Sequence, residues 1–83
     1  MNINEIYNKL LYIGLECEIT QFGIVGGIIK TCENGQNIYH EPFSIIEEYD
    51  GQYSLLFPET DKYFEGSLKE IFNLIKINYN IDK

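Results

Sequence analysis

Acid–base chemistry in this chain would have to start from its single histidine. His40 is followed by Glu41, and a carboxylate beside an imidazole can orient it as a general base. The nearest hydroxyl groups in the sequence belong to Tyr39 and Ser44, and neither forms a nucleophile motif with His40. We therefore expect His40 to be an ordinary strand or loop residue, and we predict that the protein is not an enzyme.

The two cysteines, Cys17 and Cys32, are the other candidates for reactivity. Either one could form a thiol–imidazole pair with His40, but neither sits in a motif that activates a thiol. No CxxC sequence is present, so a structural zinc site lacks its usual signature. Two cysteines also make no secreted disulfide framework. We expect free, buried thiols in a reducing cytoplasm.

Binding of phosphate or of a metal ion would need patterns that are missing here. The glycine-rich segment GIVGG has neither the Lys-Ser/Thr that follows one phosphate-binding loop nor the GxGxxG spacing of the other. The acidic turn YDGQYS does not supply the alternating acids of a calcium loop. We expect a turn or a close backbone approach at GIVGG, solvated acids elsewhere, and no cofactor or metal.

The charge of the chain is its strongest functional signal. Thirteen acids face six lysines and no arginine, for a net charge of −7, and seven of the acids crowd into residues 41–65 among six aromatic residues. Such a balance disfavours nucleic acid and anionic membranes as partners. Acid beside tyrosine favours a basic protein partner, although charge also serves solubility and tyrosines also pack across strands. The predicted partner-binding residues are Tyr39, Glu41, Glu47, Glu48, Tyr49, Asp50, Glu59, Asp61 and Tyr63.

Helical spacing of apolar residues predicts one helix at each end of a single domain, residues 1–83. The first covers residues 3–13, with Asn2 as its cap and Gly14 at its end. The second begins at the capping box formed by Ser67 and Glu70. Between them, residues 15–32 are expected to hold a strand, a loop or short irregular strand over the glycines, and another strand at 28–32 before an Asn34-Gly35 turn.

A β-hairpin is the clearest element of the middle of the chain. Residues 43–49 and 52–57 flank Asp50-Gly51, a favoured two-residue turn. An uninterrupted ladder would pair Glu48 with Tyr53 and Ile46 with Leu55. That register puts Ile46, Tyr53, Leu55 and Phe57, with Ser44 and Glu48, toward the helices, and Phe43, Ile45, Glu47, Tyr49, Gln52, Ser54 and Leu56 on the other face.

The predicted fold class is therefore α+β. A turn at 58–61 leads into a short strand at 62–65, which completes a meander. We expect a small antiparallel sheet of four or five strands packed against the N-terminal and C-terminal helices. An exposed edge in the 28–32 or 62–65 region could pair with another chain. No signal peptide or membrane-spanning run is evident, and we expect a cytoplasmic protein.

The layout resembles the small immunity proteins of bacterial contact-dependent growth inhibition and related polymorphic toxin systems. The resemblance is carried by an opening helix, NINEIYNKLLYIG, a meander, FSIIEEYDGQYSLLFPETDKYFEG, and a closing helix, SLKEIFNLIKINY. Many members have a Trp near the position of Tyr53 and a Ser-Glu-Arg-Gly turn where this chain has Pro58-Glu59-Thr60-Asp61. The resemblance implies a non-enzymatic antitoxin that binds one cognate toxin, for which a basic nuclease domain is expected. The alternative is a phage-type anti-defence protein that inhibits a nucleic-acid-guided nuclease.

Overall fold

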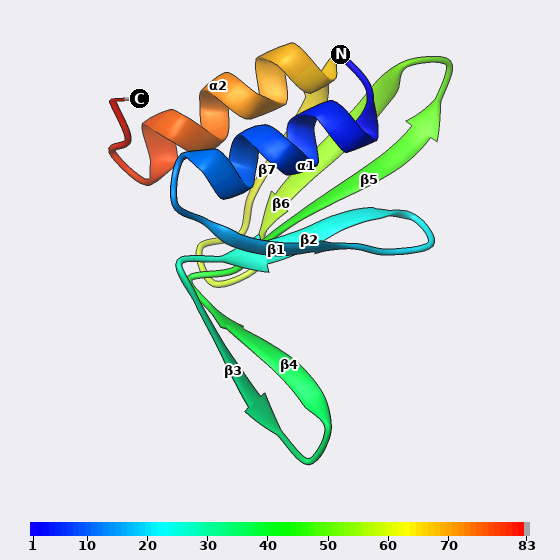
Figure 1. The fold of residues 1–83 in the computed structure, drawn as a ribbon. Coiled ribbons are helices and arrows are strands. Elements are labelled where there is room, and N and C mark those ends of the chain that lie inside the picture. The colour runs from blue at the N-terminus through cyan, green and yellow to red at the C-terminus, as the bar shows by residue number, and fades with distance from the viewer. Residues whose placement is uncertain (83) are drawn as a thin grey trace.

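The computed structural model describes residues 1–82 and has the predicted α+β fold (Figure 1). The predicted domain extends to residue 83, which lies outside the described residues. One antiparallel sheet has the strand order β1-β2-β5-β6-β7, and a separate two-stranded sheet is formed by β3 and β4. The elements are α1 (Ile3–Tyr12), β1 (Glu16–Ile19), β2 (Gly23–Gly27), β3 (Ile29–Glu33), β4 (Gln36–His40), β5 (Phe43–Tyr49), β6 (Gln52–Phe57), β7 (Lys62–Gly66) and α2 (Leu68–Asn78).

Both helices begin at the predicted caps. The Asn2 Oδ1 accepts a hydrogen bond from the backbone N–H of Glu5 at 2.9 Å. At the second helix Ser67 and Glu70 form a full capping box, in which each side chain accepts from the backbone of the other residue. Gly14 follows the first helix with a φ of +99°, a conformation that glycine adopts at low cost.

The helices α1 and α2 lie side by side on one face of the five-stranded sheet (Figure 1). Each presents an apolar stripe to the sheet, as the spacing predicted. Strands β5 and β6 supply the opposite wall of the core, because alternate side chains of a strand point to one face. Fully buried members of this core include Ile6, Leu10, Ile24, Phe43, Ile45, Leu55, Ile71 and Ile75.

The glycine-rich segment is a regular strand, which corrects the expectation of a loop or irregular strand. Gly23–Gly27 forms β2, which lies between β1 and β5 and pairs with both. A Cβ added to Gly23 would come within 1.9 Å of the carbonyl oxygen of Ile45, and one added to Gly26 within 2.3 Å of that of Glu16. The glycines therefore permit close approach of neighbouring strands rather than a turn.

The predicted turn between β5 and β6 is present, but the register beyond it is shifted. Tyr49 pairs with Gln52 as expected, whereas the next pair is Glu47 with Tyr53, because Glu48 forms a β-bulge. A shift of one residue moves every side chain of the strand to the opposite face. The prediction that Ile46 faces the helices and Ile45 does not was therefore wrong: Ile45 is 1% exposed and Ile46 is 39% exposed.

The same shift corrects the other β5 residues. Phe43 is buried in the core rather than open, and Ser44 and Glu48 lie on the side away from the helices. The predicted faces of β6 are correct, since Tyr53, Leu55 and Phe57 are buried against the helices.

A second hairpin leaves the sheet between β2 and β5, and its return strand was not predicted. We call β3, β4 and their Asn34-Gly35 turn the arm. In Figure 1 it projects from the sheet on the side opposite the helices. A Cβ on Gly27 would lie 2.4 Å from the carbonyl oxygen of His40 and 3.0 Å from the Cβ of Tyr39, so glycine lets the base of the arm pack closely on β2.

Candidate protein-binding face

The side of the sheet away from the helices has an apolar floor with polar groups around it. We call it the open face. Its floor contains Val25 from β2, Ile46 from β5 and Leu56 from β6, and Val25 and Leu56 are half-buried. Alternation along the strands places Glu16 and Glu18 of β1 on this face, with Tyr63 and Glu65 of β7 at the far edge.

Two carboxylates at the β5–β7 end of the open face are fixed by hydroxyl groups. Ser54, which is only 4% exposed, donates its hydroxyl hydrogen to Glu48 Oε1 at 2.8 Å. Tyr63 donates to Glu65 Oε1 at 2.7 Å. Ser54 and Glu65 are register partners, so both carboxylates flank the same serine. The bulge at Glu48 thus matters to the site, because bulges commonly re-aim a side chain.

A third carboxylate, that of Glu18, joins the open face to the arm. The Tyr39 hydroxyl donates to Glu18 Oε1 at 2.9 Å, and the Asn37 side-chain amide donates to the same oxygen at 3.4 Å. Both donors come from one side of β4, and we call this side, with Lys30 and Cys32 of β3, the inner face of the arm. The arm is therefore held against β1 through one acceptor.

The tyrosine donors remain protonated over the neutral range. The hydrogen bond to Glu65 raises the pKa of Tyr63, and burial followed by the hydrogen bond to Glu18 raises the pKa of Tyr39. In both cases a nearby carboxylate disfavours a second negative charge on the phenol oxygen. All donors to the three carboxylates are thus neutral groups, and none of them brings a compensating positive charge.

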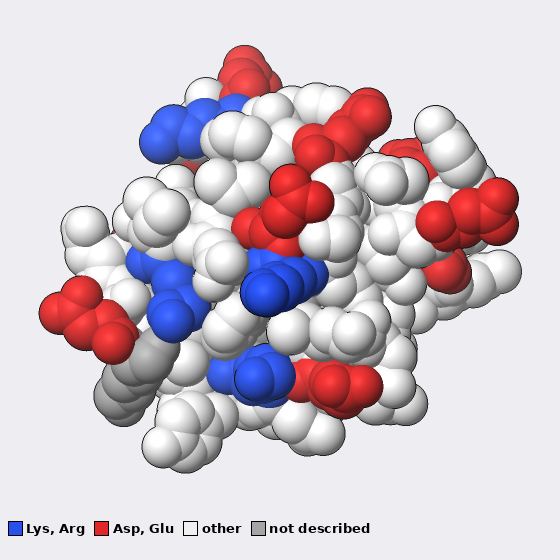
Figure 2. All heavy atoms as spheres, turned by 90° about the horizontal axis from the view of Figure 1, so that it is seen from above, with Lys and Arg blue, Asp and Glu red and all other residues white. Residues whose placement is uncertain are grey.

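Positive charge gathers instead on the helix side. Lys9 lies in α1, and Lys69 and Lys76 lie in α2. Figure 2, which views the molecule from the helix side, shows lysines interspersed with acids there. Lys9 and Lys76 both lie over the ring of Phe72, with Nζ 5.8 Å and 5.5 Å from its centroid. Among the described lysines only Lys30, on the inner face of the arm, accompanies the acids of the open face.

The predicted partner-binding residues fall into four separate places. The open face and the arm carry Tyr39, Glu48 and Tyr63. Tyr49 and Asp50 lie at the exposed tip of the β5–β6 hairpin, and Tyr49 is 70% exposed. Glu47 accepts a 3.3 Å hydrogen bond from the hydroxyl of Tyr53, on the helix-covered side.

The remaining three predicted acids lie at the other end of these strands. Glu41 and Glu59 line a small hollow beside Tyr79, whose hydroxyl donates to the Glu41 carbonyl oxygen at 2.5 Å. Burial, with the charges of Glu41 and Glu59, raises the pKa of Tyr79. Asp61 lies in the β6–β7 turn with a φ of +54°. The acidic stretch therefore does not form one continuous surface.

Sequence reasoning missed several members of the open face. Glu65 was counted among the acids but not among the binding residues, although its spacing from Tyr63 puts both on one side of a strand. Of the apolar floor only Leu56 was placed on this face: Ile46 was missed because the hairpin register was taken as uninterrupted, and Val25 because a loop or irregular strand was expected there. Nothing in the sequence indicates that Glu18 meets Tyr39, since that contact requires the arm to fold onto β1.

The chemistry-capable residues are not brought together. His40 and Cys32 lie on opposite sides of the arm, and Cys17 is buried on the helix-covered side of β1. Burial, then the charge of Glu16, raises the pKa of the Cys17 thiol to about 11. Within residues 1–82 no group of three or more His, Cys, Asp or Glu side chains is placed to hold a metal ion.

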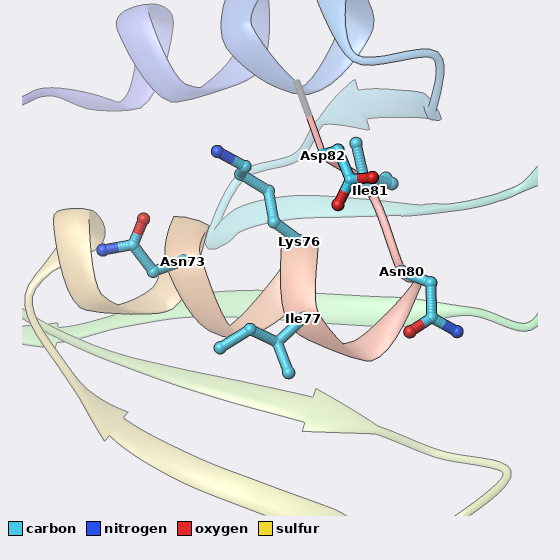
Figure 3. A pocket seen from close by; sticks show the side chains of 6 residues that line it. All are labelled: Asn73, Lys76, Ile77, Asn80, Ile81 and Asp82. Carbon is cyan, nitrogen blue, oxygen red and sulfur yellow. The ribbon is translucent and has the colours of Figure 1, made fainter.

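A further hollow lies on the helix side. It has a volume of about 550 Å³ and borders the last turns of α2 (Figure 3). Its lining offers no pairing of a nucleophile with a base, and none of the predicted site residues belongs to it. The lining residues are Asn73, Lys76, Ile77, Asn80, Ile81 and Asp82.

Comparisons with models of protein families, with curated proteins and with solved structures found no match to this chain. Neither helix in the described part of the chain is long and apolar enough to cross a membrane.

Proposed function

We propose that this protein is an immunity protein: a non-enzymatic cytoplasmic antitoxin that binds a cognate toxin domain and covers a basic surface on it. The expected toxin is a nuclease, whose substrate-binding surface must be basic to hold phosphates. The binding surface in this proposal is the open face together with the inner face of the arm. The observation that carries the proposal is that Glu18, Glu48 and Glu65 are held by neutral donors on a face that the helices leave uncovered.

Carboxylates arranged in this way suit recognition of arginine and lysine. Glu48 and Glu65 each accept one hydrogen bond and Glu18 accepts two on a single oxygen, so all three have oxygen lone pairs left for a partner. An arginine can then add a charge-assisted, often bidentate, pair of hydrogen bonds. Because Ser54 and Tyr63 already restrict the rotamers of Glu48 and Glu65, less side-chain entropy is lost on binding.

The apolar floor would supply the remainder of the binding energy. Val25, Ile46 and Leu56 lie between the acids, so a partner that covers the floor also excludes water from the ion pairs. The net charge of −7 would speed the approach of a basic partner and make association sensitive to salt.

The first test is co-expression with the protein encoded by the adjacent upstream gene. The proposal predicts that this neighbour is toxic alone, that the present protein restores survival, and that the two co-purify. If the neighbour is not toxic and forms no complex, the immunity assignment is wrong, and a host nuclease becomes the bait for the alternative anti-defence function.

The second test maps the surface. Charge reversal at Glu48→Lys and Glu65→Lys together should weaken the complex by at least about 100-fold, as loss of close ion pairs typically costs several kcal/mol. The matched control reverses two acids away from the open face, Glu5→Lys and Glu59→Lys, with the same change in net charge. An equal loss in both double variants would mean that only the overall charge matters and would remove the open face as the site.

A further inference from the structure

Strand β7 lies at one edge of the five-stranded sheet, next to β6. Tyr49 and Gln52 flank the two-residue loop of the β5–β6 hairpin, and residues in this position exchange backbone hydrogen bonds. Gln52 therefore directs its backbone N–H and C=O groups toward β5. Because these groups point to alternate sides along a strand, the β6 residues that direct theirs toward β7 are Tyr53, Leu55 and Phe57.

This alternation decides which backbone groups of β7 point away from the sheet. The three β6 residues that face β7 are paired with Gly66, Phe64 and Lys62, so the backbone groups of these partners point back toward β6. The N–H and C=O groups of Tyr63 and Glu65 therefore point outward. An extended segment of another chain could pair with these two residues as a sixth strand.

The two sides of this edge differ in chemistry. On the open face, Glu65 pairs with Ser54, and Ser54 donates to Glu48, so two carboxylates lie near the edge. On the helix side, a hollow of about 90 Å³ between β7 and α2 is lined mainly by apolar side chains. Its lining residues are Phe57, Lys62, Phe64, Leu74, Ile77 and Asn78. An added strand would thus present alternate side chains to carboxylates and to an apolar hollow.

From these observations we propose that a basic, extended segment of the partner adds to the outer edge of β7 as a sixth strand of the sheet. Its cationic residues would lie opposite Tyr63 and Glu65, beside the carboxylates of Glu65 and Glu48. An apolar residue opposite Phe64 would enter the hollow. The expected segment alternates arginine or lysine with aliphatic residues. The inference rests on the proposed function, because it specifies how a basic toxin would engage the open face.

Charge favours a basic segment over a second copy of this chain. Two β7 edges paired with each other would place both copies of Glu48 and Glu65 along one joined edge, where like charges repel. Lys62 lies on the helix side with the hollow and does not offset these acids. The other edge strand, β1, is a weaker candidate, because two donors of the arm already occupy one oxygen of Glu18.

Amide hydrogen exchange of the wild-type protein, followed by NMR, tests the proposal with a capped peptide of alternating arginine and valine. Saturating peptide should slow exchange of the Tyr63 and Glu65 amides by at least about tenfold. The control peptide has the same composition with its arginines and valines in two blocks, and it should leave both amides unprotected. Unchanged exchange with the alternating peptide, or equal protection by the two peptides, overturns the proposal.

A proline variant tests the backbone contact. Tyr63→Pro removes an outward N–H, and edge strands tolerate proline where the N–H faces solvent. Tyr63→Val removes the same side chain but keeps the N–H. Affinity for the alternating peptide, measured by calorimetry, should be at least about tenfold lower in Tyr63→Pro than in Tyr63→Val. Equal affinities would contradict strand addition, and if Tyr63→Pro does not fold, the exchange of the wild-type amides decides.

Strand addition and the immunity function can fail separately. A toxic neighbour that this protein neutralises, with no protection of Tyr63 and Glu65 by the peptide, would support the immunity function and overturn strand addition. Protection by the alternating peptide alone, with no toxic neighbour, would support strand addition and overturn the immunity function.

Discussion

The two faces of the five-stranded sheet are made from residues that alternate along the same strands, but one face is buried and the other is exposed. Ile45 and Ile46 are consecutive and of the same type, yet one is 1% exposed under the helices and the other is 39% exposed on the open face. On the helix side the strands contribute apolar groups to a closed core. On the open side an apolar floor is bordered by carboxylates that hydroxyl and amide groups orient.

The comparison suggests how a short chain divides its apolar residues between folding and binding. A domain of this length buries a modest fraction of its surface, so most large apolar residues are needed in the core. Those left on the open face contribute little to stability and are available for an interface. The same division applies to charge, since three of the described lysines lie on the helices and three oriented carboxylates lie on the open face.

The largest expected effect contrasts the two isoleucines directly. Ile45→Ala removes a fully buried side chain and leaves a cavity, so the free energy of unfolding should fall by about 2–5 kcal/mol. Ile46→Ala should cost roughly 1 kcal/mol or less, because the side chain is already partly in water. Urea denaturation of both variants measures this contrast. Equal losses would contradict the observed register, and a larger loss in Ile46→Ala than in Ile45→Ala would favour the uninterrupted hairpin.

The next effect concerns the attachment of the arm to the sheet. Gly27→Ala would place a Cβ 2.4 Å from the backbone oxygen of His40, so the base of the arm must move. We expect a loss of about 1–3 kcal/mol in unfolding free energy, the usual cost of overpacking. Hydrogen exchange of the β3 and β4 amides should quicken at the same time. Gly35→Ala in the turn of the arm is the comparison: its Cβ meets nothing within 4 Å, so any loss there comes from the left-handed backbone, with a φ of +78°, and not from crowding.

A smaller effect is expected from replacing Ser54, whose side chain is buried although it lies on the side of the sheet away from the helices. Ser54→Ala deletes the donor to Glu48, and loss of one such hydrogen bond should lower the unfolding free energy by about 0.5–1.5 kcal/mol. Ser44→Ala, half-buried on the same face, should cost less. If partner binding falls more than stability does in Ser54→Ala, then orientation of the Glu48 carboxylate contributes to recognition.

The smallest effect is expected at Glu70 in α2, where the contribution to the free energy of unfolding depends on pH. Hydrogen bonds from the backbone and the side chain of Ser67 lower the pKa of Glu70 in the folded protein. A lowered carboxyl pKa stabilises the fold above the ordinary glutamate pKa, and this contribution is lost as pH falls through the folded value. Glu70→Gln should therefore show a shallower decline in unfolding free energy between neutral and acidic pH than the wild type. Identical profiles would show that the capping charge contributes nothing measurable.

Local signals were sufficient for most of the fold but not for the faces of the sheet. The caps Asn2 and Ser67 and the Asp50-Gly51 turn fix their elements through neighbouring atoms alone, so the sequence predicts them well. The bulge at Glu48 shifts the register of β5 against β6, and no short sequence motif predicts it. The strand that begins at Gly23 and the hydrogen bond from Tyr39 to Glu18 both depend on the close approach of segments that are distant in sequence. The spacing of apolar residues along the chain carries no information about such contacts.

For the candidate site, residue types were more predictable than their arrangement. Acid does lie beside tyrosine on the open face, where Tyr63 contacts Glu65 and Tyr39 contacts Glu18. Crowding along the chain was a poor guide, because turns carry Asp50 and Glu59 to opposite ends of the same hairpin. Acids that are close in sequence form a charged patch on the surface only where they lie on the same face of the molecule.

The most direct test of the open face as the binding surface is the affinity of two matched charge-neutralised variants for the co-purified neighbour protein, measured by calorimetry. Glu48→Gln with Glu65→Gln keeps the side-chain shapes and the acceptors for Ser54 and Tyr63 but removes two charges. Glu5→Gln with Glu59→Gln removes two charges elsewhere. We predict at least about a tenfold loss of affinity in the first variant and little change in the second. Equal affinities in the two variants would contradict a binding role for the open face.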